Sequence, residues 1–173
     1  MNETIKSILE RRSIRSFTDR KIERDLLEQI VQAGYYAPSG RNLQTWRFTV
    51  VQNKEVMERL AQAVRQALGR GEDYDFYRPD VLILTSNQRD NPLGMDDCAC
   101  ALENIFLAAH SLGIGSVWIN QFKGICDQPA VREVLHSIGV LQDHLVYGCA
   151  ALGYPADVPG CAVKNQEVVT WIL

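Results

Sequence analysis

Three guanidinium groups and a hydroxyl lie within five residues near the N-terminus, in the segment Arg11-Arg12-Ser13-Ile14-Arg15. Arginine makes paired hydrogen bonds to phosphate, and the serine hydroxyl adds a further donor. Because side chains alternate along an extended chain, Ser13 and Arg15 are expected on the same side. The pattern is typical of a site for a small phosphorylated ligand. The alternative is a solvated basic turn whose arginines pair with nearby acids such as Glu3 and Glu10.

Two further segments present amides and hydroxyls that could contact a ligand. The first is the predicted loop Pro38-Ser39-Gly40-Arg41-Asn42-Leu43-Gln44-Thr45-Trp46, whose polar groups could bind the edge of a heterocycle while Trp46 anchors it in the core. The second is the pair Asn120 and Gln121, which follows a predicted buried strand. Both segments also have an ordinary structural interpretation, because amides and hydroxyls stabilise turns and often end strands. Neither pattern is specific by itself.

Composition limits the partners that these segments could have. The chain has 173 residues, of which 46% are hydrophobic and 23% charged, and this balance predicts a single globular domain over 1–173. The net charge is −3, yet residues 1–24 alone carry seven basic and four acidic side chains. A basic segment in an otherwise acidic protein favours a small anion over long nucleic acid.

The cysteines and the N-terminus indicate a cytoplasmic protein without a metal centre. The five cysteines are scattered, with no CxxC pair, which is typical of reduced thiols and fits neither a disulfide framework nor a zinc site. Cys98 and Cys100 are expected on a buried, inert helix face. The chain shows no signal-peptide pattern and no apolar run long enough to span a membrane.

The motif search finds no residues that would carry catalysis by themselves. The sequence contains no Rossmann fingerprint, no phosphate-binding GxxxxGK[ST] loop and no GxSxG elbow. Asp96 and Asp97 are interpreted as acids that cap a helix rather than as a catalytic pair. A bound cofactor would therefore have to supply any chemistry.

Hydrophobic periodicity predicts the elements that must position these segments, and their alternation predicts an α+β fold. Helices are expected over about 3–12, over about 23–33 with Gly34 as its stop, from Asn53 to Gly69, over about 96–112, and from Pro129 onward. Strands are expected over about 46–51, 81–85, 116–119 and 145–152, and the tail 168–173 is strand-like. An apolar tail of this kind is expected to pair with a sheet edge, either its own or that of a partner subunit.

Taken together, the segments resemble the FMN-dependent nitroreductase family, specifically its short single-domain members. The resemblance is carried by Arg11-Arg12-Ser13-Ile14-Arg15-Ser16-Phe17, by Ala37 to Trp46, and by Asp97 to Ala109. It continues through Leu112-Gly113-Ile114-Gly115-Ser116-Val117-Trp118-Ile119 and Leu152-Gly153-Tyr154-Pro155. Their order and spacing are together specific.

The resemblance implies a nitroreductase-like fold: a central mixed or antiparallel sheet of four or five strands surrounded by helices, in an intertwined homodimer with FMN at each of two interfaces. By the same resemblance, Arg11 and Arg12 would contact the FMN phosphate, Ser13 the ribityl chain and Arg15 the pyrimidine side of the ring. The remaining implied contacts are Pro38, Ser39 and Asn42 from the other subunit, Gln44 supporting that loop, Asn120 and Gln121 beside the ring, and Lys164 near the phosphate.

The implied activity is ping-pong hydride transfer from NADH or NADPH through the flavin N5 to a nitroaromatic, quinone or similar oxidant. The alternatives are a relative that uses FMN for dehalogenation or flavin fragmentation, and a flavin-binding or sensing protein without turnover. The chain departs from the family at Thr45, where proline is typical, and at Lys164, which stands alone where a basic pair is typical.

Overall fold

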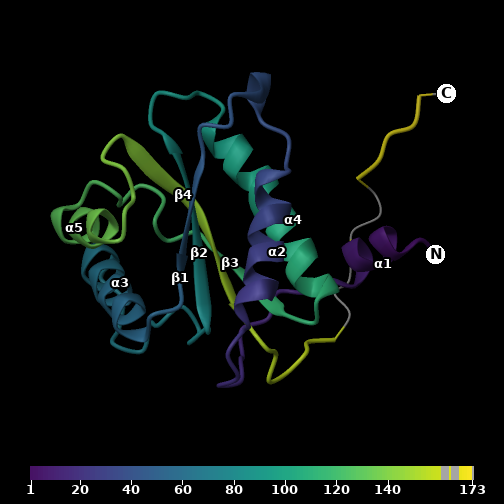
Figure 1. The fold of residues 1–173 in the computed structure, drawn as a ribbon, viewed down its shortest axis with the longest axis horizontal. Coiled ribbons are helices and arrows are strands. Elements are labelled where there is room, and N and C mark those ends of the chain that lie inside the picture. Colours follow the sequence, from purple (N-terminus) through teal and green to yellow (C-terminus); the bar gives the residue numbers. More distant parts are fainter. Residues whose placement is uncertain (161–163, 165–167, 173) are drawn as a thin grey trace.

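The computed structural model describes residues 1–160, 164 and 168–172. Its centre is a four-stranded antiparallel sheet in the order β1-β2-β4-β3, made of β1 (Arg47–Val51), β2 (Val81–Gln88), β4 (His144–Gly153) and β3 (Gly115–Ile119). Helices α3 (Lys54–Leu68) and α5 (Pro129–Ser137) cover one face, and α2 (Arg24–Tyr35) and α4 (Gly94–Ser111) cover the other (Figure 1). Helix α1 (Glu3–Glu10) lies outside α4. The α+β prediction is confirmed, with every strand pair antiparallel.

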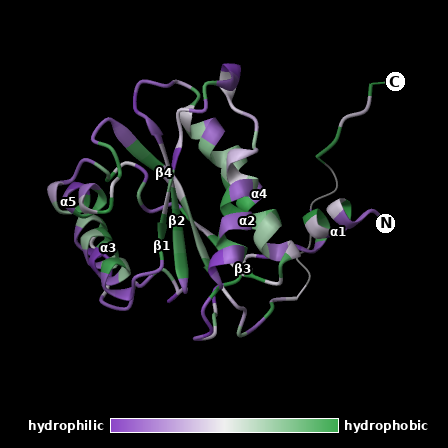
Figure 2. Ribbon diagram, in the orientation of Figure 1, coloured by the Kyte–Doolittle hydropathy of each residue, from purple (hydrophilic) through white to green (hydrophobic). Residues whose placement is uncertain are grey.

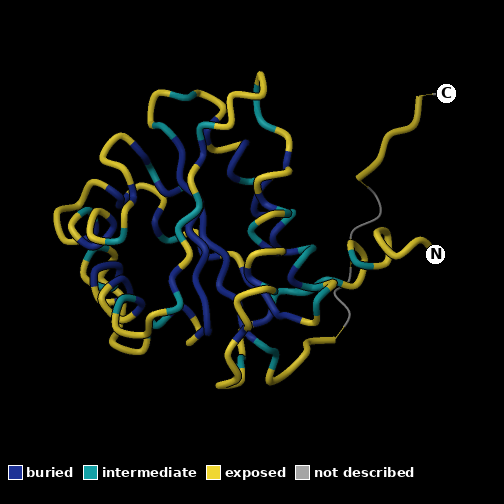
Figure 3. The backbone as a smooth tube through the Cα atoms, in the orientation of Figure 1, coloured by how far each residue is buried: buried dark blue, intermediate teal, exposed yellow. Residues whose placement is uncertain are grey.

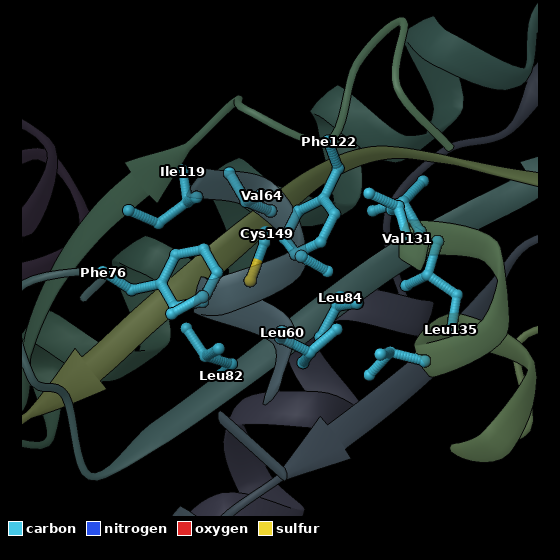
Figure 4. Packing of buried hydrophobic residues seen from close by; sticks show 14 of the residues in the cluster. Leu60, Val64, Phe76, Leu82, Leu84, Ile119, Phe122, Val131, Leu135 and Cys149 are labelled. Atoms are coloured by element: carbon cyan, nitrogen blue, oxygen red, sulfur yellow. The ribbon is translucent and has the colours of Figure 1, made fainter. Parts of the chain in front are cut away.

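Alternation along the two central strands divides the apolar residues between two cores. Leu82, Leu84 and Cys149 face α3 and α5, where they pack with Phe76 and Phe122 (Figure 4). On the opposite face, the next residues along the same strands pack against α2 and α4. Figure 2 shows the apolar residues concentrated in these strands, whereas the tip that carries the short helix η1 (Gly40–Asn42) is hydrophilic. The sheet is therefore the rigid frame for the candidate site segments: the loop that ends at Trp46 leads into β1, and Asn120 and Gln121 follow β3.

Local signals locate several helix ends correctly. The Asn53 side chain accepts a hydrogen bond from Val56 N at 3.0 Å, and Gly69 ends α3 in the left-handed conformation with φ 61°. Pro129 opens α5 as expected. Gly34, by contrast, does not stop α2. It lies inside the helix, where a Cβ would come within 3.0 Å of Ile105 on α4, so this glycine serves close helix packing.

Helix α4 lies in the middle of the molecule, as its apolar sequence predicted, but it has an exposed strip. Cys98 is buried, whereas Cys100 is exposed, so the expectation that both are buried is wrong for Cys100. The helix begins at Gly94, and Asp97 lies in its first turn without capping it. The Asp97 side chain instead contacts the loop before β1.

The two ends of the chain are the most exposed parts of the structure (Figure 3). No residue of α1 is buried, and Trp171 and Ile172 are 78% and 95% exposed. Residues 168–172 form no strand and pair with no sheet edge of their own chain, so that half of the tail prediction is wrong; pairing with a partner subunit stays a prediction, and residue 173 lies outside the described residues. Within the described residues, no helix is long and apolar enough to cross a membrane.

Candidate functional site

The arginine segment is attached to the sheet along the outer edge of β3. Ile14 N donates to Ser116 O at 2.9 Å, and Ser13 forms a parallel bridge with Ser116. Further along, Phe17 bridges Pro155, the residue that follows Tyr154 after β4. Ile14 is only 5% exposed, whereas Arg15 is exposed. The segment is therefore fixed by its backbone and by one buried side chain, which leaves Arg15 exposed and Arg11 and Arg12 partly exposed.

Arg11 and Arg12 begin this segment at the end of α1. Arg12 NH1 donates to Leu9 O at 2.7 Å and to Arg11 O at 2.8 Å, so part of its guanidinium group caps the last carbonyls of the helix. The Arg11 guanidinium carbon lies 6.0 Å from the centre of the Phe106 ring, and Arg11 Nε lies 3.8 Å from Glu103 Oε1. A cavity of about 190 Å³ beside Arg12 is lined by Ile14, Ser116 and other residues of this region.

The outer edge of β3 presents main-chain groups and an aromatic ring beside these arginines. Ser116 O points away from β4, toward Ile14, so the peptide groups of Trp118, two residues on, also point outward. Trp118 is 42% exposed, and the centre of its ring lies 5.9 Å from that of Phe106, the ring that Arg11 approaches. Sequence inspection did not single out Trp118 as a site residue. Side chains alternate along a strand, so Trp118 could have been placed on the same face of the sheet as Ser116.

Arg15, Gln121 and Tyr77 lie near one another at a second cavity. The Arg15 guanidinium carbon is 5.9 Å from the centre of the Tyr77 ring, and Tyr77 and Gln121 both line a cavity of about 300 Å³. Asn120 is exposed, and its N–H donates to Gln121 Oε1 at 3.1 Å. Tyr77, which sequence reasoning missed, follows Phe76 in a run of three non-glycine residues with positive φ.

The loop before β1 has a strained backbone. Arg41, Asn42 and Gln44 have φ values of 54°, 55° and 50°, a region that costs a non-glycine residue about 1–2 kcal/mol. Gln44 Nε2 donates to Asn42 Oδ1 at 2.8 Å, and Gln44 N donates to Ser39 Oγ at 3.3 Å. Gln44 therefore supports the loop from within. Pro38 and Asn42 are exposed and Ser39 is half-buried, so the loop presents these polar groups at the tip of the molecule.

The structure does not bring this loop and the arginine segment together within one chain. The loop contacts Asp97 in the first turn of α4, whereas Arg11 approaches Phe106 near the other end. Nine residues of helix separate these two points by about 13 Å. Lys164 is exposed, and the residues on both sides of it lie outside the described part of the chain. The loop and Arg11 thus lie at different points along α4, while Arg15 and Gln121 lie near Tyr77.

Comparison with known proteins places this arrangement in a family. The model of the Nitroreductase family matches residues 8–154. The structure superimposes on a nitroreductase with bound FMN from Bacteroides fragilis with a TM-score of 0.94, at 38% identity and with full coverage of both chains. The chain belongs to the nitroreductase family, which confirms the resemblance of its motifs.

Two relatives by sequence carry names that describe activities. A protein of Archaeoglobus fulgidus whose name includes "NAD(P)H nitroreductase" is 35% identical over 159 residues, which cover 91% of this chain and 88% of that protein. A Bacillus subtilis protein named FMN reductase [NAD(P)H] is 29% identical over 195 residues, covering 96% of this chain and 74% of that protein.

Proposed function

We propose that this protein is a single-domain, FMN-dependent oxidoreductase of the cytoplasm. It would transfer a hydride from NADH or NADPH to a nitroaromatic, quinone or similar oxidant in a ping-pong cycle. The observation that carries the proposal is the arginine segment, whose backbone is bonded to the outer edge of β3 and whose three arginines keep part of their surface exposed. The FMN-bound relative and the relative named as an FMN reductase support the choice of cofactor.

The donors of the arginine segment fit the chemistry of FMN. A flavin phosphate needs charge-assisted donors, and Arg11 together with the Nε and NH2 groups of Arg12 would supply them, because NH1 of Arg12 makes both bonds to α1. Ser13 would contact the ribityl chain. Asn120 and Gln121 would bond the polar edge of the ring, and Lys164 would add a weak contact to the phosphate.

Arg15 would act on the electronics of the cofactor without donating a proton to substrate. When bound, FMN would supply the hydride acceptor and donor that the chain itself lacks. A guanidinium group beside the pyrimidine edge stabilises negative charge there, and Arg15 would supply that group. No side chain need then act as an obligate acid or base.

A homodimer would complete the site. The loop with Pro38, Ser39 and Asn42 contacts the first turn of α4, whereas Arg11 approaches Phe106 further along that helix; in a dimer the loop would contact FMN held by the partner subunit, with Gln44 supporting it. The exposed apolar side chains of α1 and the tail, among them Ile8, Leu9 and Trp171, are suited to a subunit interface. Sedimentation showing a stable 19.5 kDa species at micromolar concentration would refute the dimer.

The activity is tested by recording the visible spectrum of the purified protein before and after anaerobic addition of NADH or NADPH. We expect flavin bands that bleach, followed by turnover with menadione or nitrofurazone. Bound flavin that neither nucleotide bleaches would instead indicate a binding protein without turnover. Colourless protein that takes up no added FMN would refute the cofactor assignment.

Matched arginine variants locate the phosphate contact. Arg11→Ala should weaken FMN binding, whereas Arg24→Ala, which removes an exposed arginine paired with Glu28 on α2, should leave it unchanged. Equal effects of the two variants would show that only overall charge matters.

A further inference from the structure

A cluster of four polar side chains fastens the strained loop to the sheet and to α4. The cluster consists of Thr45, Asn87, Asn91 and Asp97. Asp97 is 4% exposed, and its carboxylate accepts hydrogen bonds from Gly40 N at 2.7 Å and from Asn91 Nδ2 at 3.4 Å. Asn91 Nδ2 also donates to Thr45 Oγ1 at 3.1 Å, and Thr45 Oγ1 donates to the fully buried Asn87 Oδ1 at 2.7 Å.

The attachment points lie on both sides of the residues with positive φ. Gly40 precedes the strained residues Arg41, Asn42 and Gln44, and Thr45 follows them. Left-handed backbone is unfavourable for residues other than glycine, so an exposed loop held at neither end would relax to another conformation. A Cβ at Gly40 would also collide with the Leu93 side chain, so the loop backbone rests directly on the turn before α4.

We propose that Asp97 and Thr45 are positioning residues, which hold the loop in the conformation that presents Ser39 and Asn42 to FMN. This inference rests on the function proposed above. A site group that is already ordered before binding loses less entropy when the cofactor arrives. The family pattern has proline at position 45, and the proline ring would restrict the backbone there. In this chain the Thr45 hydroxyl would restrict the loop instead, through its hydrogen bonds with Asn87 and Asn91.

Asp97 has a competing interpretation, since a carboxylate in the first turn also interacts favourably with the helix dipole. Asp96 provides the matched control, because it lies in the same turn and is exposed. Asp96→Ala removes the same charge from the helix start as Asp97→Ala, and only Asp97 binds the loop. At position 45, Thr45→Val removes the hydroxyl at constant shape, and Thr45→Ser restores it.

The experiment measures two properties of each full-length variant: hydrogen exchange of the loop amides in FMN-free protein, and the Kd for FMN by fluorescence titration. For Asp97→Ala and Thr45→Val we expect exchange at Gly40 to Gln44 to accelerate and the Kd to rise about tenfold or more, because only the ordered fraction of the loop is competent to bind. Asp96→Ala and Thr45→Ser should stay within about twofold of wild type. If Asp97→Ala does not fold, the Thr45 pair carries the test.

The outcomes separate this inference from the proposed function. If the wild-type protein binds FMN but Thr45→Val binds it equally well, the positioning role is overturned and the flavin function stands. If Asp96→Ala is as damaging as Asp97→Ala, the helix charge explains the effect and the positioning role of Asp97 is overturned. If wild-type protein binds no FMN, the proposed function fails, and the positioning role toward FMN is overturned with it.

Discussion

The close approach of Gly115 to Ile14 provides a direct test of how the arginine segment is held. A Cβ at position 115 would lie 2.9 Å from each of Cβ, Cγ1 and Cγ2 of Ile14, which is closer than such carbons approach in real structures. Ile14 is β-branched and nearly buried, so its side chain has little freedom to rotate away. Gly115→Ala must therefore push Ile14, and the arginines on either side of it, off the edge of β3.

The cost follows from two contributions. Overpacking a well-packed site costs about 1–3 kcal/mol, and losing the bond from Ile14 N to Ser116 O costs about 1 kcal/mol. A total of about 2–4 kcal/mol would lower the Tm of a domain of this size by roughly 4–16 °C. If only a tenth of the molecules keep the segment in place, the Kd for FMN should rise about tenfold.

Thermal unfolding followed by circular dichroism and FMN titration by fluorescence measure these two effects. Gly160→Ala is the control, because a Cβ there meets no atom of the described residues within 4 Å. In an Ile14→Ala background two of the three clashing carbons are absent, so the added cost of Gly115→Ala should fall by about half or more. Wild-type stability and FMN affinity in Gly115→Ala, or full additivity with Ile14→Ala, would refute this account of the segment.

Three further predictions concern single side chains. Arg15→Ala should slow flavin reduction in stopped-flow measurements more than it weakens FMN binding; the reverse order would contradict its placement at the ring. Burial lowers the pKa of His144, with Asp143 opposing and Arg47 contributing. Because the unfolded chain binds this proton more readily, the free energy of unfolding should fall as the pH drops below 6.5, and His144→Gln should flatten that dependence in urea titrations. Burial also raises the pKa of Cys98 to about 12, whereas Cys100 is exposed. Titration of the native protein with a thiol reagent should therefore show one rapidly reacting thiol fewer in Cys100→Ser than in wild type. An unchanged number of rapidly reacting thiols would show that Cys100 is protected.

Features encoded by local sequence could be predicted, and features made by distant contacts could not. Asn53, Gly69 and Pro129 act on their own helix, so their roles were evident from position alone. Gly34 follows a predicted helix just as Gly69 does. A glycine is needed at position 34, however, because the side chain of Ile105 packs against it, seventy-one residues away in the chain. Tertiary packing thus decides what a glycine does, and periodicity cannot show it.

The same distinction explains which site residues were found. Arg11, Arg12, Ser13 and Arg15 lie within five residues, so their chemistry is visible as a cluster in the sequence. Asp97 was interpreted as a capping acid because acids in a first turn usually stabilise the helix locally. Its actual partner, Gly40 N, lies fifty-seven residues earlier, and only the folded chain brings the two together.

The spacing imposed by α4 leads to a final prediction about subunit composition. If the loop of one subunit contacts FMN bound to the arginines of the other, a mixed dimer of Arg11→Ala and Asn42→Ala chains contains one site with both lesions and one site with neither. If each site is built within a single chain, both sites of the mixed dimer carry one lesion. Tandem purification of differently tagged chains, followed by FMN titration, distinguishes the two arrangements. On the shared-site proposal, we expect half of the sites in the mixed dimer to bind FMN with wild-type affinity, because the loop and the arginine segment of one chain lie at different points along α4. Weak binding at every site would show that one subunit supplies both groups and would refute the shared site.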